Sequence, residues 1–121
     1  MTLKRVLIVD DNRALAENLA EILEAEGIEA TVFSDPLEAR EHAAAIEYDA
    51  ALLDVRMPGI DGVDLCHALR RHHPDAPHLL MTAFAGEERL ETAMSCARKV
   101  LWKPFGPQEL LDALRAIEED D

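Results

Sequence analysis

Apolar and polar positions alternate along the chain in a way that separates short apolar runs from longer amphipathic stretches. The apolar runs predict strands over 5–9, 29–33, 50–53, 78–81 and 99–102. Several of them are continuously apolar, as expected when helices cover both faces of a parallel sheet. Strands that alternate with helices through short links predict an α/β fold with right-handed crossovers.

The amphipathic stretches carry the period of helices. The apolar face of the first helix holds Leu15, Leu19, Ile22 and Leu23, and Gly27 suits its C-terminal stop. Further helices are expected over 35–46, 62–73, 86–97 and 107–118. The second and the last of these five helices open with Pro36 and Pro107, which are well tolerated in a first turn.

Length and charge limit the function. The 121 residues fit a single domain, 1–121, and a hydrophobic share of 49% allows a core of its own. The net charge of −13 would repel bare phosphate backbones and anionic membrane surfaces. We therefore expect neither direct nucleic-acid binding nor membrane binding, whereas a basic partner or a bound cation fits the charge.

The cysteines and histidines invite structural interpretations. Cys66 and Cys96 lack CxxC spacing, and we interpret them as buried small apolar side chains rather than as a disulfide or a metal site. We interpret the histidines His67, His72, His73 and His78 as part of a solvated helix end. The first residues do not resemble a signal peptide, and we expect a cytoplasmic protein.

The candidate chemistry lies where the predicted strands end. Asp10 and Asp11 follow the first strand, Asp54 the third, Thr82 the fourth and Lys103 the fifth. In open parallel sheets, sites form beyond the carboxyl ends of the strands. Three close carboxylates repel one another unless a cation intervenes, and Mg²⁺ prefers such oxygen ligands. An Asp-Asp pair alone is common in a chain this acidic, so the indication comes from the whole set.

The loop after the third strand is the most specific segment. It reads Met57-Pro58-Gly59-Ile60-Asp61-Gly62, in which proline fixes φ, glycines permit tight turning and Asp61 can cap the next helix. With Val9-Asp10-Asp11, Leu53-Asp54, Met81-Thr82-Ala83 and Lys103-Pro104-Phe105, this loop resembles the receiver domain of two-component response regulators. The resemblance extends over essentially the whole chain. It implies a CheY-like, flavodoxin-like (βα)5 fold with strand order 2-1-3-4-5.

The resemblance implies a role for each matching residue. Asp54 would accept a phosphoryl group from a histidine kinase or a histidine phosphotransfer protein. The Mg²⁺ ligands would be Asp11, Asp54 and the backbone carbonyl of Arg56, with Asp10 acting mainly through water. Thr82, the Ala83 amide and Lys103 would contact the phosphoryl group, and the Lys103-Pro104 bond would be cis. The surface of the fourth helix, fifth strand and fifth helix would then change to control a partner or a linked output domain.

Some positions depart from the family or modulate it. The position that carries an aromatic switch residue in many members is Val100 here, and Trp102 shares its strand face. We hypothesise that Trp102 partly takes over the readout; the alternative is that it only packs. Arg56 and Phe84 are expected to border the entry path of water, with Phe84 lengthening the life of the acyl phosphate. Further readout candidates are Arg89, Met94 and Leu111.

Other functions remain to be weighed. An aspartyl-phosphate hydrolase of the haloacid dehalogenase type needs a DxDx[TV] run, whereas this chain has Asp10-Asp11-Asn12-Arg13. A docking module without phosphorylation would not need the full site. A receiver that turns over no separate substrate, as a monomer or weak dimer, is the preferred interpretation. It is either a stand-alone regulator or the N-terminal receiver of a longer DNA-binding regulator or hybrid histidine kinase.

Overall fold

A parallel sheet forms the centre of the protein. In the computed structural model, which describes residues 3–83 and 95–119, the strands are β1 (Arg5–Val9), β2 (Glu29–Phe33), β3 (Ala50–Asp54), β4 (His78–Thr82) and β5 (Lys99–Trp102). All pairings are parallel, and the order is β2-β1-β3-β4-β5. The predicted doubly wound, flavodoxin-like fold with order 2-1-3-4-5 is thus confirmed.

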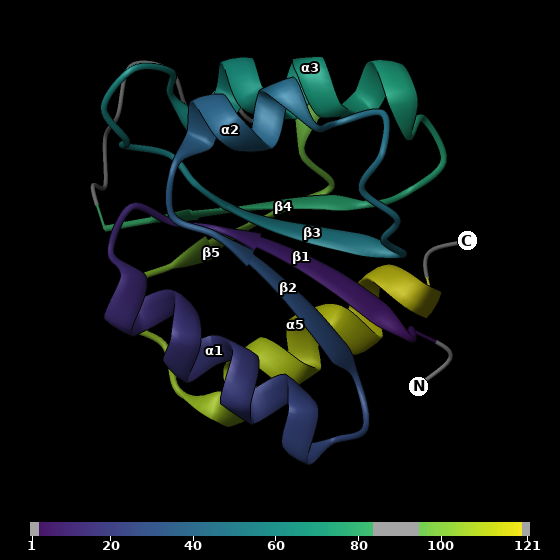
Figure 1. Ribbon diagram of the computed structural model, residues 1–121. Helices are drawn as coiled ribbons and strands as arrows, with labels where there is room; N and C mark the ends of the chain where they lie inside the picture. The colour runs from purple at the N-terminus through teal and green to yellow at the C-terminus, as the bar shows by residue number, and fades with distance from the viewer. Residues whose placement is uncertain (1–2, 84–94, 120–121) are drawn as a thin grey trace.

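Helices cover both faces of this sheet. Figure 1 shows α1 (Arg13–Ala25) and α5 (Pro107–Glu119) on one face, and α2 (Pro36–Glu41) and α3 (Gly62–His72) on the other. Side-chain oxygens cap three of the helices, as sequence preference at N-caps predicts: Asn12 accepts from the Leu15 amide, Asp35 from Leu37 and Asp61 from Asp64. Of the expected helix over 86–97, only the last residues are described, and Ser95 and Cys96 are helical.

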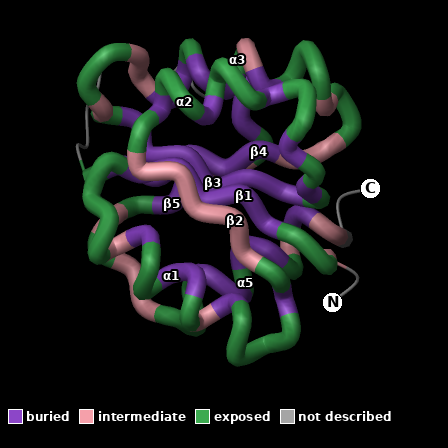
Figure 2. The backbone as a smooth tube through the Cα atoms, viewed as in Figure 1, coloured by how far each residue is buried: buried purple, intermediate pink, exposed green. Residues whose placement is uncertain are grey.

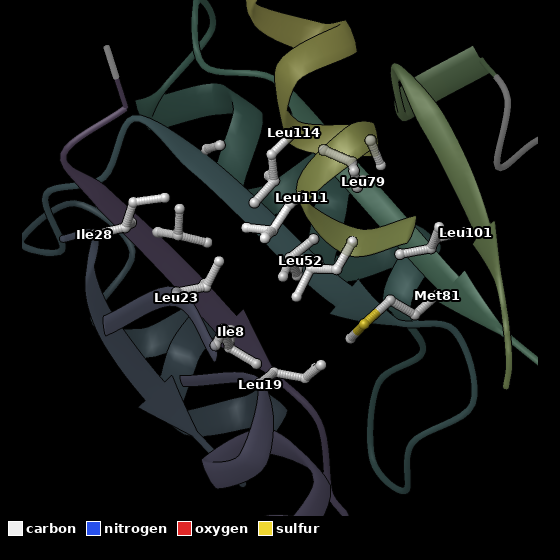
Figure 3. Close-up of a cluster of buried hydrophobic side chains, with 14 of the residues drawn as sticks. Ile8, Leu19, Leu23, Ile28, Leu52, Leu79, Met81, Leu101, Leu111 and Leu114 are labelled. Atoms are coloured by element: carbon white, nitrogen blue, oxygen red, sulfur yellow. The ribbon is translucent and has the colours of Figure 1, made fainter. Parts of the chain in front are cut away.

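Alternate residues of each strand build two cores. Val6 and Ile8 of β1 face α1 and α5, whereas Leu7 and Val9 face α2 and α3. Figure 2 shows that the central strands are buried and that edge strand β2 is only half-buried. Figure 3 draws part of the core on the α1/α5 face, to which Leu23 of α1, Leu52 of β3 and Leu114 of α5 contribute. Because helices cover both faces of the sheet, the ends of the strands are where side chains remain open to chemistry.

The second helix is shorter than predicted. The expectation was 35–46, but α2 ends at Glu41. After His42 the amide of Ala43 turns to the Arg40 carbonyl and that of Ala45 to the His42 carbonyl, three residues back instead of four. These tight turns bury Ala43 and Ile46 against the sheet. Packing therefore overrides the helix preference of this alanine-rich stretch.

The interpretation of the cysteines as unpaired core residues is wrong. Cys66 of α3 and Cys96 form a disulfide, and their Cα atoms lie 6.4 Å apart. They are indeed buried, but parallel β4 and β5 bring α3 and the segment before β5 onto the same face. No spacing in the sequence reports that proximity.

The interpretation of the histidines as part of a solvated helix end is also wrong in part. His78 is 1% exposed at the start of β4, and its Nε2 lies 2.8 Å from the Tyr48 hydroxyl. His73 Nε2 lies 2.9 Å from the Ala43 carbonyl, and its ring packs on Tyr48. Burial lowers the pKa of His78 to about 4, so this side chain is neutral at physiological pH.

Within the described residues, no helix combines the length and apolarity that a membrane crossing requires.

Candidate functional site

The carboxyl edge of the sheet gathers the acidic residues that the sequence predicted. Asp10 and Asp11 follow β1, and Asp54 is the last residue of β3. Their carboxylate oxygens lie within 4.8 Å of one another. Asp10 is fully buried, Asp54 is 8% exposed and Asp11 faces solvent. The cluster therefore opens outward through Asp11, while its base lies inside the protein.

A single ammonium group joins two of these carboxylates. Lys103 Nζ donates to Asp10 Oδ2 at 3.0 Å and to Asp54 Oδ1 at 3.2 Å. Its backbone amide donates to the Thr82 carbonyl at 2.7 Å, which continues the β4–β5 pairing to the site. The Lys103-Pro104 peptide bond is cis. Lysine thus reaches from the edge strand across β4 and β3 to β1.

These contacts change how the site holds protons. Burial, together with the Asp10 charge, raises the pKa of Asp54 from 3.8 to about 6, against the opposing effect of Lys103. Burial would lower the pKa of Lys103, but its bonds to Asp10 and Asp54 outweigh burial and raise that pKa. At neutral pH, Asp54 is therefore mostly a carboxylate and Lys103 an ammonium.

Close backbone packing fixes the position of Asp54. The Val55 amide donates to the Met81 carbonyl, and the Gly62 amide donates to the Val55 carbonyl at 2.8 Å. A Cβ on Gly62 would lie 2.1 Å from the Asp54 carbonyl oxygen, so only glycine fits this approach. Gly59 adopts φ +91°, which glycine also favours. The predicted loop is therefore a tight support that connects β3 to α3.

The donor set fits a hard divalent cation. Carboxylate oxygens at this separation are the ligands that Mg²⁺ prefers, and three of them carry more negative charge than one lysine neutralises. Exposed Asp11 lies on the solvent side, where an ion could keep its waters. Arg56, two residues after Asp54, is an exposed residue beside this edge.

The remaining predicted residues differ in how far they are exposed. Thr82 ends β4 and is 3% exposed, and Ala83 follows it on the surface. Val100 is half-buried in the core of the α2/α3 face, whereas Trp102 is 42% exposed. Leu111, expected as a readout residue, is instead buried in the other core (Figure 3). Phe84, Arg89 and Met94 lie outside the described residues.

Comparisons with known proteins identify the family. The family model of the response regulator receiver domain matches residues 6–115. A response regulator receiver protein of Anaeromyxobacter sp. (strain Fw109-5) is 42% identical over 111 residues, which cover 91% of this chain and 47% of that protein. The response regulator MprA of Mycobacterium ulcerans is 40% identical over 114 residues, covering 93% and 49%. The chain spans about half the length of these curated relatives.

Solved structures agree. A CheY-like receiver domain protein of Methanospirillum hungatei superposes with a TM-score of 0.91 at 27% identity, covering 98% of this chain and 96% of that one. The response regulator TrrA of Thermotoga maritima, solved in complex with Mg²⁺ and BeF, gives 0.83 at 32% identity, covering 93% and 97%. The family model, the relatives and the fold agree, and the chain belongs to the response regulator receiver domains of two-component signalling systems.

Proposed function

We propose that residues 1–121 form one receiver domain that accepts a phosphoryl group on Asp54, with Mg²⁺, and acts as a phosphorylation-driven switch. The observation that supports this most is the contact of Lys103 Nζ with both Asp10 and Asp54, which sets a positive charge beside a largely buried carboxylate. The donor would be a histidine kinase or a histidine phosphotransfer protein. The chain would turn over no separate substrate.

The chemistry follows from the ionisation of Asp54. With its pKa near 6, Asp54 is a carboxylate at neutral pH, and one of its oxygens can attack the phosphorus while the P–N bond of the donor phosphohistidine breaks. Asp11, Asp54 and the Arg56 carbonyl would hold Mg²⁺, with Asp10 acting through water. The bound ion would neutralise charge on the oxygens of the transferred phosphoryl group. Lys103 would pair with a phosphoryl oxygen, and Thr82 and the Ala83 amide would hydrogen-bond to others.

The surface beside the site offers a place for the donor. A groove of about 310 Å³ is lined by Leu15, Leu19 and Ile22 of α1, and by Lys103 through Pro107. Because Lys103 itself lines the groove, a protein seated there would lie next to Asp54. A phosphohistidine carried by that protein would then be within reach of the acceptor, which favours direct transfer between proteins. The expected compartment for this transfer is the cytoplasm.

The output would pass through β5. Trp102 is the exposed residue of the pair that we hypothesise to carry the readout, and Val100 is its half-buried neighbour. Arg56 and Phe84 would limit the access of water and so set the slow self-dephosphorylation. The curated relatives are about twice as long as this chain. The proposed switch is therefore either the N-terminal receiver of a DNA-binding regulator or a stand-alone regulator, monomeric or weakly dimeric.

The test is the intact mass after incubation with acetyl phosphate and Mg²⁺. We expect one added phosphoryl group in the wild type, no addition without Mg²⁺, and no addition in Asp54→Asn. Asp49→Asn, which removes a carboxylate at the opposite edge of the sheet, is the matched control and should be labelled normally. An unlabelled wild type that also fails to bind fluoroberyllate would favour the docking-module alternative.

A further inference from the structure

The disulfide between Cys66 and Cys96 joins two parts of the protein that the proposed phosphoryl chemistry does not use. Cys66 lies in α3, and Cys96 lies three residues before β5. Their Cα separation of 6.4 Å is one that disulfides span without backbone movement. We propose that this pair is a reversible redox switch, closed by a hydroperoxide and opened by a dithiol, that holds the segment leading into β5 against α3.

The surroundings of Cys96 make it the thiol that reacts first. Cys96 is 6% exposed, whereas Cys66 is fully buried. Cys96 lines a cavity of about 100 Å³ together with Arg70 and Arg98. Arg70 Nη1 also donates to the Cys96 carbonyl at 3.3 Å, which keeps its guanidinium close to this residue. Positive charge stabilises the thiolate, the reactive form of cysteine, and the cavity gives a small oxidant a path.

The reaction balances with a hydroperoxide as the oxidant. The Cys96 thiolate attacks one peroxide oxygen, the O–O bond breaks, and the leaving oxygen takes a proton to become water or an alcohol. The Cys66 sulfur then attacks the resulting sulfenic acid, forming the S–S bond and releasing water. Two electrons pass from the two sulfurs to the peroxide. A dithiol reverses the change by thiol–disulfide exchange and is itself oxidised.

The closed pair would act on the part of the sheet that carries the readout. Both cysteines, Ala97 and Val100 belong to one hydrophobic cluster on the α2/α3 face. The Arg98 amide donates to the His78 carbonyl at 2.8 Å, where the β4–β5 pairing begins. A covalent link at residue 96 therefore anchors the N-terminal end of β5, and Trp102 lies at the other end of the same strand. The regulatory meaning rests on the proposed function, in which this surface moves on phosphorylation.

Thiol counting tests the chemistry. The wild type is reduced, treated with hydrogen peroxide, denatured and alkylated, and its mass is measured. We expect both cysteines to escape alkylation after peroxide and to be alkylated again after dithiothreitol. Arg70→Gln should form the disulfide about threefold or more slowly, because it removes charge beside Cys96. Arg71→Gln, which removes the same charge from the next residue of α3 outside the cavity, should react at the wild-type rate.

Thiols that stay open to alkylation after peroxide, or a product that dithiothreitol does not restore, would overturn the proposal. Equal rates of disulfide formation in Arg70→Gln and Arg71→Gln would overturn the assignment of Cys96 as the thiol that reacts first.

Amide hydrogen exchange tests the clamp without any phosphoryl group. Peptides covering 95–102 should exchange about fivefold or more slowly in the oxidised protein than in the reduced protein. Peptides from β1, which β3 and β4 separate from β5, and from α1, on the opposite face of the sheet, should change by less than about twofold. The Cys66→Ala/Cys96→Ala variant should not respond to peroxide. Uniform slowing along the chain would mean a general structural link, and no slowing would mean no clamp; either result overturns the switch.

Fluoroberyllate with Mg²⁺ links the pair to signalling. We expect the reduced protein to bind this phosphoryl mimic about threefold or more tightly than the oxidised protein, since binding moves a surface that the disulfide holds. Equal affinity of the two forms would overturn the regulatory role. If neither form binds the mimic and neither is labelled by acetyl phosphate, the proposed function fails, whereas thiol counting and exchange still decide the clamp.

Discussion

At the scale of single residues, Asp54 ties the stability of the protein to pH. Its pKa is about 6 in the folded protein and 3.8 ordinarily, so the folded state binds more protons between these values. The free energy of unfolding should therefore fall as pH rises through this window, by about 2–3 kcal/mol from this group. Urea unfolding from pH 4 to pH 8 without Mg²⁺ measures it, relative to Asp54→Asn.

The variant separates Asp54 from the many other carboxylates. Asn cannot ionise, so Asp54→Asn should match the wild type at pH 4 and exceed its stability at pH 7. The remaining acids titrate in both proteins and cancel in the difference. Parallel stability profiles over the whole range would show that burial and Asp10 do not raise the pKa of Asp54.

Lys103 is the second residue whose removal has a definite sign. Lys103→Met leaves buried Asp10 and Asp54 facing each other without the ammonium that now lies 3.0 and 3.2 Å away. We expect a loss of about 2 kcal/mol of unfolding free energy without Mg²⁺. Added Mg²⁺ should restore more stability in the variant than in the wild type, because the ion no longer competes with the lysine. Thermal unfolding with and without Mg²⁺ measures both effects.

Lys99→Met provides the control for Lys103→Met. Lys99 lies at the start of β5, at the opposite edge of the sheet from the carboxylates. It should lose little stability and respond to Mg²⁺ as the wild type does. An equal Mg²⁺ response of Lys103→Met and the wild type would argue against competition between the ion and the lysine.

At the scale of elements, the β3–α3 loop depends on one glycine. Gly62→Ala would drive a Cβ to 2.1 Å from the Asp54 carbonyl oxygen, a backbone atom that no side-chain rotation can move. We expect a loss of about 2–3 kcal/mol, and weaker Mg²⁺ binding because Asp54 shifts with its backbone. Gly106→Ala, where a Cβ meets nothing within 4 Å, should be near neutral. Equal unfolding midpoints in urea for the two variants would contradict the packing argument.

The elements also show what sequence patterns report. Three strands begin and end where predicted, and β3 and β4 each extend one residue further, since continuous apolar runs mark strands covered on both faces. Helix α2 is the exception, because burial of Ala43 and Ile46 ends it early. The strand-end residues Asp10, Asp54 and Lys103 came together because parallel strands share their carboxyl edge. The Cys66–Cys96 and Tyr48–His78 pairs depend on packing between distant elements, which periodicity does not encode.

At the scale of the whole molecule, the candidate site and the disulfide lie toward opposite ends of the strands. The carboxylates and Lys103 occupy the carboxyl edge of the sheet, whereas Cys96 precedes the opposite end of β5. At that opposite edge too, the Leu3 amide, just before β1, donates to Glu118 of α5. Phosphoryl chemistry at the carboxyl edge can therefore be combined with a covalent constraint near the start of β5, although the site residues and the disulfide lie at opposite ends of that strand.

The disulfide should also contribute to global stability. It closes a loop with a sequence separation of 30, which restricts the unfolded chain. Reduction should therefore lower the free energy of unfolding by about 3.5 kcal/mol in the chain-entropy model. Urea unfolding with and without dithiothreitol measures this, and Cys66→Ala/Cys96→Ala should be insensitive to the reductant. Since the unfolded state carries this effect, it should appear in the midpoint even if fluoroberyllate binding does not change. An unchanged midpoint on reduction, in a protein that thiol counting shows to be oxidised, would contradict the chain-entropy argument for this pair.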